Sequence, residues 1–325
     1  MPIANYEGGF SDGITIRGVP ISITHPGKVF WVSNSTVQLA NQKAGSNSNS
    51  GKFNDPYSTI AYALTQCTAD RGDVIMVKPG HTETVSTATA LAFNVAGVAI
   101  IGLGRGSKRP TITLDTANTA TIAIAGANIA VKNILFVGNF LGIASAITVG
   151  AAPDCVLEQL EFRDTSAILN FLACITTTVT VNADRLYIGD CVVKSDATTK
   201  TVAPFVVLGT MTGLTIVRNR ITQTVAQNNK SQLLSHAALV MTDALVKDNL
   251  VHCVNTDSAT GGLLITTSAT TGSGWCIRNR VKALDTAGAI LVTATAVQWA
   301  MFDNLYIGEA TSVSGFVLPA IDTDA

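Results

Sequence analysis

The sequence is poor in charge: Asp, Glu, Lys and Arg make up only 13% of its 325 residues, and the formal net charge is −1. A nearly neutral chain has no excess of basic residues with which to neutralise nucleic-acid phosphates or an anionic membrane surface. We therefore expect neither nucleic acid nor membrane among its partners. At 47%, hydrophobic residues are frequent enough to form a large core, which excludes a disordered chain.

Other absences narrow the class further. No apolar run reaches the length of about 18 residues that a membrane-spanning helix requires. The opening MPIANYEGGF shows neither the basic nor the apolar region of a secretory signal, so we expect no secretory signal and synthesis in a reducing cytoplasm. The six cysteines form no CxxC pair and lie among Val and Ile, which is typical of buried free thiols. We expect no metal ion and no cofactor.

A repeat is present instead. Thr, Ala, Val, Ile, Gly and Asn dominate the sequence, which favours strands and tight turns over helices. One polar residue recurs within an apolar run every 25 to 31 residues, and a second short apolar run precedes each copy without room for a crossover helix. This pattern predicts an all-β, right-handed parallel β-helix, a single-stranded solenoid whose coils stack over one core. The recurring residues are Asn133, Gln159, Asp190, Asn219, Asn249, Asn279 and Asn304.

The recurring amide has a structural interpretation. Asn tolerates left-handed turn conformations, and its side chain both donates and accepts hydrogen bonds. Stacked once per coil, these seven side chains are predicted to form a ladder along the solenoid. The residue before each of them nearly alternates in charge, so we expect attraction between coils that fixes their register. This column contains Lys132, Glu158, Gly189, Arg218, Asp248, Arg278 and Asp303.

The N-terminal part breaks the pattern. We divide the chain into an arm over residues 1–28 and a β-helix domain over residues 29–325. The segment DPYSTIAYALTQC, with Ser58 as its N-cap, predicts a helix near 57–69 that caps the first coil. The arm lacks core periodicity and is predicted to be an extended segment, at most one added strand, that docks on another chain. Its apolar docking residues are Tyr6, Phe10, Ile14, Ile16, Val19 and Ile21.

Two stretches carry a family resemblance. DPYSTIAYALTQC followed by GDVIMVKPGHTETV resembles the capping helix and first coil of pectate-lyase-like β-helix proteins, many of which are bacteriophage virion proteins. GFSDGITIRGVPISITHPGKVFWVSNS resembles the N-terminal stretch of phage structural proteins of this type. The motifs cover residues 9–115, and the rest is similar by repeat architecture. The resemblance implies a virion component that is trimeric.

Catalysis by such a fold would require clustered carboxylates, either as an acid and base pair or as calcium ligands. The acidic residues do not recur at one position of the aligned coils. His81 lies in a turn, where a locally bonded histidine is the commoner role. We therefore predict no catalytic residue and a protein that is not an enzyme. The best candidate for a groove groups Glu158, Glu161, Asp164, Asp184 and Asp190.

The sequence thus predicts a capsid decoration or cement protein of a bacteriophage. It would be a homotrimer that contacts the major capsid protein or other virion proteins, be made in the host cytoplasm and be located in the virion. A tailspike or tail-fibre module that binds or cleaves a host surface polysaccharide is the alternative. A secreted polysaccharide lyase agrees less well with the opening residues.

Overall fold

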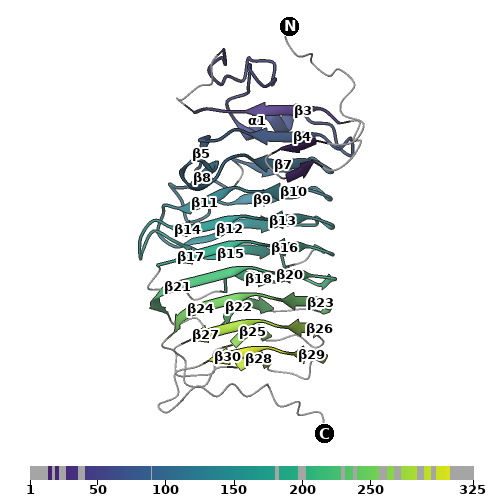
Figure 1. The fold of residues 1–325 in the computed structure, drawn as a ribbon, viewed down its shortest axis with the longest axis vertical. Coiled ribbons are helices and arrows are strands. Elements are labelled where there is room, and N and C mark those ends of the chain that lie inside the picture. Colours follow the sequence, from purple (N-terminus) through teal and green to yellow (C-terminus); the bar gives the residue numbers. More distant parts are fainter. Residues whose placement is uncertain are drawn as a thin grey trace.

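The computed structural model describes residues 14–16, 19–21, 27–35, 41–88, 90–179, 183–196, 203–227, 231–236, 240–255, 262–266, 272–283, 289–293 and 298–307. Within these residues the chain winds into stacked coils, and most coils add one strand to each of three parallel sheets (Figure 1). The protein is a parallel β-solenoid of the right-handed type, with almost no helix. The predicted all-β class and solenoid architecture are confirmed.

The first sheet contains eleven strands. They are β3 (Val29–Val32), β4 (Val74–Val77), β7 (Ala99–Gly102), β10 (Ala130–Lys132), β13 (Val156–Glu158), β16 (Tyr187–Gly189), β20 (Thr215–Val217), β23 (Met241–Lys247), β26 (Gly272–Ile277) and β29 (Gln298–Phe302), with β19 (Met211–Thr212) beside β23.

The second and third sheets contain nine and eight strands. The second comprises β5 (Thr82–Val85), β8 (Thr111–Leu114), β11 (Leu135–Gly138), β14 (Glu161–Asp164), β17 (Val192–Ser195), β21 (Arg220–Gln227), β24 (Leu250–Asn255), β27 (Arg280–Ala283) and β30 (Leu305–Ile307). The third comprises β6 (Ala92–Phe93), β9 (Ile122–Ile124), β12 (Ile143–Val149), β15 (Phe171–Thr177), β18 (Phe205–Val207), β22 (Ser231–His236), β25 (Gly262–Thr266) and β28 (Ala289–Thr293).

The core consists of columns of inward side chains, one from the equivalent position of each coil. Alternate residues of a strand point to opposite faces, so in-register pairing places the same inward position of every coil in one column. On the second sheet, Phe136 lies over Phe162 with ring centroids 5.3 Å apart. One inward column of the first sheet is buried over eight consecutive coils and contains Ile75, Ile100, Val131, Leu157, Ile188, Ile216, Val246 and Cys276.

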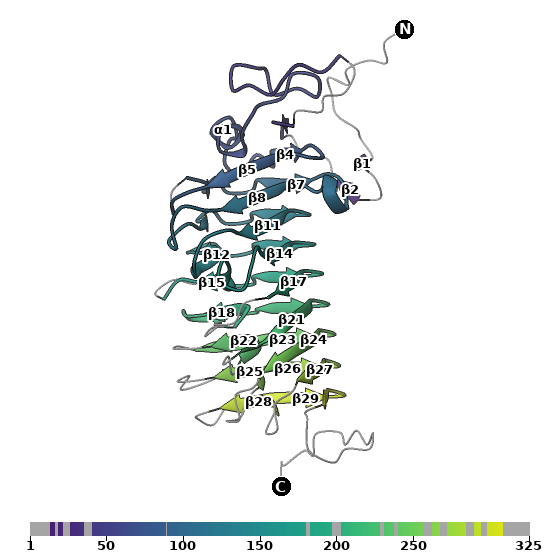
Figure 2. The ribbon, with the colours of Figure 1, turned by 90° about the vertical axis from the view of Figure 1, so that its left-hand side faces the viewer.

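A short helix, α1 (Ile60–Thr65), packs at the N-terminal end of the stack (Figure 2). Its Ile60, Ala63 and Leu64 side chains join the core cluster. The helix is shorter than the predicted span of 57–69, and its N-cap is Thr59, whose Oγ1 accepts from the backbone N–H of Tyr62 at 3.2 Å. Ser58 is not the N-cap because its hydroxyl donates to Asn47 Oδ1 at 2.8 Å.

The arm differs from the predicted extended segment. Strands β1 (Ile14–Ile16) and β2 (Val19–Ile21) pair antiparallel as a hairpin, with Ile14 opposite Ile21 and Ile16 opposite Val19. The predicted docking residues Tyr6 and Phe10 lie outside the described residues.

Candidate functional site

The corner between the first and second sheets is built from one residue per coil in the left-handed conformation. Its φ angle lies between 51° and 57° in seven successive coils. A single left-handed residue turns the chain sharply enough to join two sheets without a loop. The residue after it points inward and is buried in every one of these coils. The left-handed residues are Asn133, Gln159, Asp190, Arg218, Asp248, Arg278 and Asp303.

The seven residues of the predicted ladder therefore occupy two different positions. Asn133, Gln159 and Asp190 are left-handed corner residues, whereas the four later asparagines lie one position further along, at the buried site. Strand pairing fixes this offset, because Gly189 is in register with Val217, not with Arg218. Our alignment by side-chain type was wrong by one residue for the first three coils. The buried site there holds Ile134, Leu160 and Cys191.

The four later asparagines form a continuous ladder. Asn219 Nδ2 donates to Asn249 Oδ1 at 3.0 Å, Asn249 Nδ2 to Asn279 Oδ1 at 2.9 Å, and Asn279 Nδ2 to Asn304 Oδ1 at 2.9 Å. Each Oδ1 also accepts from the backbone N–H of the preceding ladder residue. The ladder ends where Asn219 Oδ1 accepts from the backbone N–H of Cys191 at 2.9 Å. These side chains satisfy backbone groups that the corner leaves without strand partners.

The predicted column of charged residues, Lys132 to Asp303, also occupies two different positions of the coils. Lys132 and Glu158 pair as expected, with Nζ and Oε2 2.7 Å apart. Further along, Arg218 pairs with Asp190 at 2.6 Å and Arg278 with Asp248 at 2.8 Å, all four at the left-handed position. The hydrogen bond from Arg278 lowers the pKa of Asp248. These pairs are half exposed, so each contributes at most about 1 kcal/mol.

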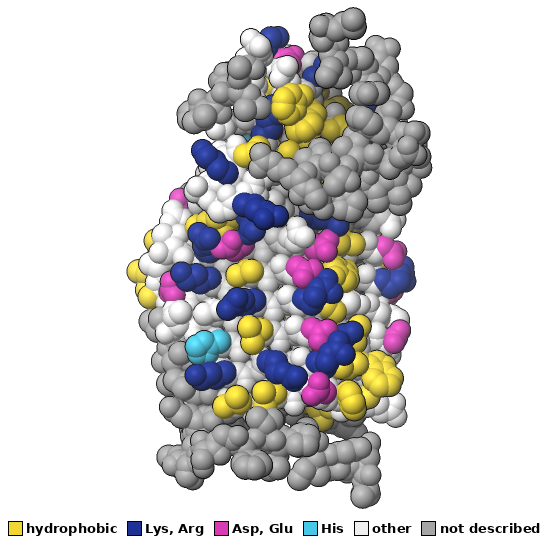
Figure 3. Space-filling view, in the orientation of Figure 1, with side chains coloured by type: hydrophobic (Ala, Val, Ile, Leu, Met, Phe, Trp, Pro, Cys, Tyr) yellow, Lys and Arg dark blue, Asp and Glu magenta, His cyan; other side chains and the backbone are white. Residues whose placement is uncertain are grey.

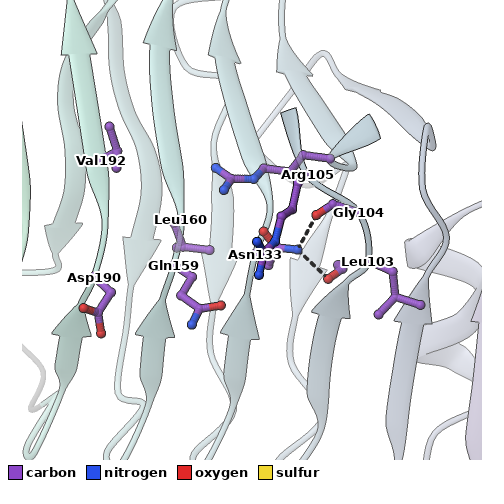
Figure 4. Close-up of a pocket in the computed structure, with 10 residues that line it drawn as sticks. Leu103, Gly104, Arg105, Asn133, Gln159, Leu160, Asp190 and Val192 are labelled. Atoms are coloured by element: carbon purple, nitrogen blue, oxygen red, sulfur yellow. Dashed lines mark hydrogen bonds between the residues drawn. The ribbon is translucent and has the colours of Figure 1, made fainter. Parts of the chain in front are cut away.

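A hollow of about 350 Å³ opens on this corner beside the 3₁₀ turn η1 (Gly106–Lys108). Asn133 Nδ2 donates to the carbonyls of Gly102 and Gly104 at 2.8 and 3.0 Å, which holds the turn against the corner (Figure 4). A Cβ at Gly102 would lie 2.2 Å from Asn133 O, so only glycine fits there. The lining residues are Gly102, Leu103, Gly104, Arg105, Arg109, Asn133, Gln159, Leu160, Asp190 and Val192.

The hollow can bind polar or anionic groups. The guanidinium of Arg105 and the side-chain amide of Gln159 can offer donors. Arg109 Nη1 donates to Glu161 Oε2 at 2.6 Å, while its buried Nε has no hydrogen-bond partner among the described residues. The sequence pattern alone did not associate Arg105 and Arg109 with the corner residues.

The acidic residues considered for a groove are dispersed. Glu161 lies between Arg109 and Arg163 on the second sheet. Asp164 accepts from Ser195 Oγ at 2.6 Å and from the backbone N–H of Phe171 at 3.0 Å. Asp184 accepts from the backbone N–H of Thr212 at 2.8 Å, on the corner that enters the first sheet. Glu158 and Asp190 belong to the ion pairs above, so the five carboxylates do not converge.

His81 is buried and links three elements. Its Nδ1 accepts from the backbone N–H of Asn34 at 3.1 Å, and its Nε2 lies 3.1 Å from Glu83 Oε2. The same carboxylate oxygen accepts from the backbone N–H of Ile60 at the start of α1. The Glu83 carboxylate therefore joins the imidazole to the start of the helix.

Lys78 is a feature that the sequence did not reveal. Only 3% of it is exposed, and its Nζ donates to Gln42 Oε1 at 2.6 Å and to Phe53 O. The ammonium lies 3.8 Å from the centroid of the Phe53 ring and 5.7 Å from that of Trp31. Burial lowers the pKa of Lys78 to about 8. This cation fastens the loop over residues 41–55 to the first coil through cation–π and carbonyl contacts.

All six cysteines are free thiols. Burial raises the pKa of Cys191 and Cys276 to about 12, which leaves the thiols protonated and unreactive. In the part of the chain that the structure describes, His, Cys, Asp and Glu side chains form no group of three suited to a metal ion. No helix among these residues has the length and apolar character to cross a membrane.

Comparisons with known proteins assign neither a family nor a function to the chain. No protein-family model matches the chain, and no curated protein matches it. Among solved structures, a rhamnogalacturonan lyase is similar over 82% of this chain and 84% of its own, at 12% identity and a TM-score of 0.42. That structure belongs to an enzyme, which contradicts our prediction that the protein is not one, and we withdraw that prediction. The similarity is too low to bring a substrate or a catalytic residue to this chain.

Proposed function

We propose that the protein is a structural component of a bacteriophage particle, a rigid rod that associates with copies of itself and with other virion proteins. The observation that carries this proposal is the outer face of the first sheet. One outward column of this face is apolar in nine of ten coils, the exception being Thr215. The column contains Val29, Val74, Ala99, Ala130, Val156, Tyr187, Thr215, Leu245, Trp275 and Ala300.

The length of this face suits association between rods. Nine steps of about 4.8 Å make it roughly 43 Å long. It is most open at the C-terminal end, where Trp275 is 54% exposed and Phe302, in the neighbouring outward column, is 70% exposed. Monomers seldom expose an apolar patch of this extent. Packing of parallel rods around a rotation axis would cover it in a closed assembly.

The resemblance of the N-terminal stretches to phage structural proteins supports a location in the virion and three-fold association. Within that proposal, a decoration or cement protein on the capsid is our first choice. The partners would be the major capsid protein or neighbouring virion proteins, with synthesis in the host cytoplasm.

Sedimentation of the full-length protein tests the self-association. We expect a trimer that dissociates in the variant W275D/F302D while its far-UV circular dichroism is retained. The matched control is V192D/L250D, which places the same two charges at aliphatic side chains of the second sheet that are 36% and 45% exposed, and it should leave the trimer intact. A monomeric wild-type protein would overturn the proposal. Its absence from purified phage particles, checked by mass spectrometry, would overturn the location.

The hollow favours a second candidate, a tailspike or tail-fibre module that binds or cleaves a host surface polysaccharide. Arg105 and the neighbouring amides are suited to sugar hydroxyl and carboxylate groups. Incubation with host polysaccharides, followed by assays for bound glycan and for new reducing or unsaturated ends, tests it. Binding or release that is lost in Arg105→Ala would favour this candidate over the capsid location.

A further inference from the structure

The charges of the protein are distributed unevenly over its surface. In the orientation of Figure 3, dark blue side chains mixed with yellow ones run down the left-hand half, and most acidic side chains lie over the right-hand half, where they adjoin further dark blue ones. The left-hand half is the outer face of the second sheet. We call it the basic face and define it by Arg109, Arg163, Lys194, Arg220, Arg280 and Lys282.

These six basic side chains are only partly neutralised. Glu161 serves both Arg109 and Arg163, at 2.6 and 2.5 Å. Asp303 lies 3.5 Å from Arg280. Asp196, two residues beyond Lys194, accepts a hydrogen bond from Thr224.

Lys194, Arg220 and Lys282 form no ion pair with any side chain that the structure describes. With Glu161, Asp303 and Asp196 set against the six basic side chains, the face keeps an excess of three positive charges. The net charge of the whole chain is −1.

Aliphatic side chains lie between the charges. Val192, Arg220, Leu250 and Arg280 follow one another in a single outward column. Val192 is 36% exposed, Leu250 45% and Ile307, in the next column, 44%. Arg220 and Arg280 are two coils apart, which is roughly 10 Å. Alternation of Arg with aliphatic groups on a flat sheet is suited to a protein surface, since arginine and apolar side chains are both favoured in protein interfaces.

We propose that the basic face is a docking site for an acidic surface of a different protein, one that presents carboxylates about 10 Å apart with apolar side chains between them. Partner carboxylates pair with Arg220, Arg280 and Lys282, and a partner apolar group covers Leu250. The charge complementarity makes the association fast and dependent on salt. This proposal is independent of association through the first sheet, because the two sheets face different sides of the solenoid (Figure 1).

Synthetic polypeptides provide the probe. We would measure binding of the full-length protein to poly-L-glutamate, to a random copolymer of Glu and Tyr, and to polygalacturonate, at several salt concentrations. We expect the copolymer to bind most tightly. R220E/K282E should weaken binding of both polypeptides at least about tenfold. Leu250→Ser should remove the advantage of the copolymer and leave poly-L-glutamate within about twofold. K43E/K52E, which makes the same two charge reversals at exposed lysines of the N-terminal loop, is the control and should have little effect.

Each other outcome overturns the proposal. Tighter binding of polygalacturonate than of either polypeptide would make the face a site for acidic polysaccharide. Equal losses in the control and in R220E/K282E would reduce the effect to net charge. Dissociation of the homo-oligomer by R220E/K282E would make the face a contact between copies of this chain. No binding of the copolymer at low salt would exclude the site.

Discussion

Replacement of Asn249 by Leu is the sharpest test of the buried asparagine ladder. The Asn249 side chain takes part in four hydrogen bonds: its Nδ2 donates to Asn279 Oδ1 and Ile216 O, and its Oδ1 accepts from Nδ2 and from the backbone N–H of Asn219. All of these groups are in the interior. Since Leu has the same branched shape and is larger, the substitution removes the hydrogen bonds without opening a cavity.

The expected loss of stability follows from those contacts. Four hydrogen bonds at about 1 kcal/mol each, together with the cost of leaving Ile216 O and the Asn219 N–H unpaired, exceed the gain from a buried leucine. We expect the free energy of unfolding to fall by about 3 to 5 kcal/mol. Urea and thermal unfolding followed by circular dichroism measure it. Hydrogen exchange of the Asn219 amide adds a local measurement, because that N–H loses its acceptor.

The control is Asn139→Leu. Asn139 lies outside the ladder at a half-buried position and makes one side-chain contact, from Nδ2 to Asp115 Oδ2 at 3.0 Å. It should cost less than about 1 kcal/mol. If both variants lose the same stability, or if the Asn219 amide exchanges no faster in N249L, the reasoning about the ladder is refuted.

Three further predictions concern single side chains. Gln159→Asn should raise the free energy of unfolding by about 0.5 to 1 kcal/mol, because Asn tolerates the left-handed φ of 57° better than Gln; an unchanged urea midpoint would contradict this. Burial lowers the pKa of Lys78 from 10.5 to about 8, so the folded protein releases this proton more readily than the unfolded chain. Stability relative to Lys78→Met should therefore increase by up to about 3 kcal/mol between pH 8 and pH 10.5, and paired denaturation curves without that trend would refute the assignment. Burial raises the pKa of Cys191 and Cys276, so a disulfide reagent at pH 8 should label them only at the rate of unfolding, and rapid labelling of native protein would show that they are accessible.

The repeat predicted most of the fold, because the core of a solenoid is one pattern repeated. The spacing of the apolar runs excluded crossover helices and predicted parallel strands. The helix near 57–69 was found within its predicted span, but its limits were not. Which of two adjacent hydroxyl residues becomes an N-cap depends on a contact with Asn47, which lies in a loop whose position the local sequence does not specify.

The sequence predicted less of the candidate site than of the fold. Aligning Asn133, Gln159 and Asp190 with the four later asparagines matched chemical type but not position. The hollow combines residues from four successive coils, which are separated by up to 90 positions in the chain, from Gly102 to Val192. No local motif indicates that these residues meet.

The sequence by itself determined that the chain stacks parallel coils, that each coil turns at a polar residue, and that the polar residues would be partnered between coils. Only the tertiary structure decided which neighbour each residue meets. A shift of one residue exchanges the inward and outward faces of a strand, and backbone pairing between coils, not side-chain type, sets that register. Pairing placed Asn219, Asn249, Asn279 and Asn304 in the interior and Arg218, Asp248 and Arg278 at the exposed corner. It also gathered the basic side chains of the second sheet on one face, a segregation that the net charge of −1 conceals.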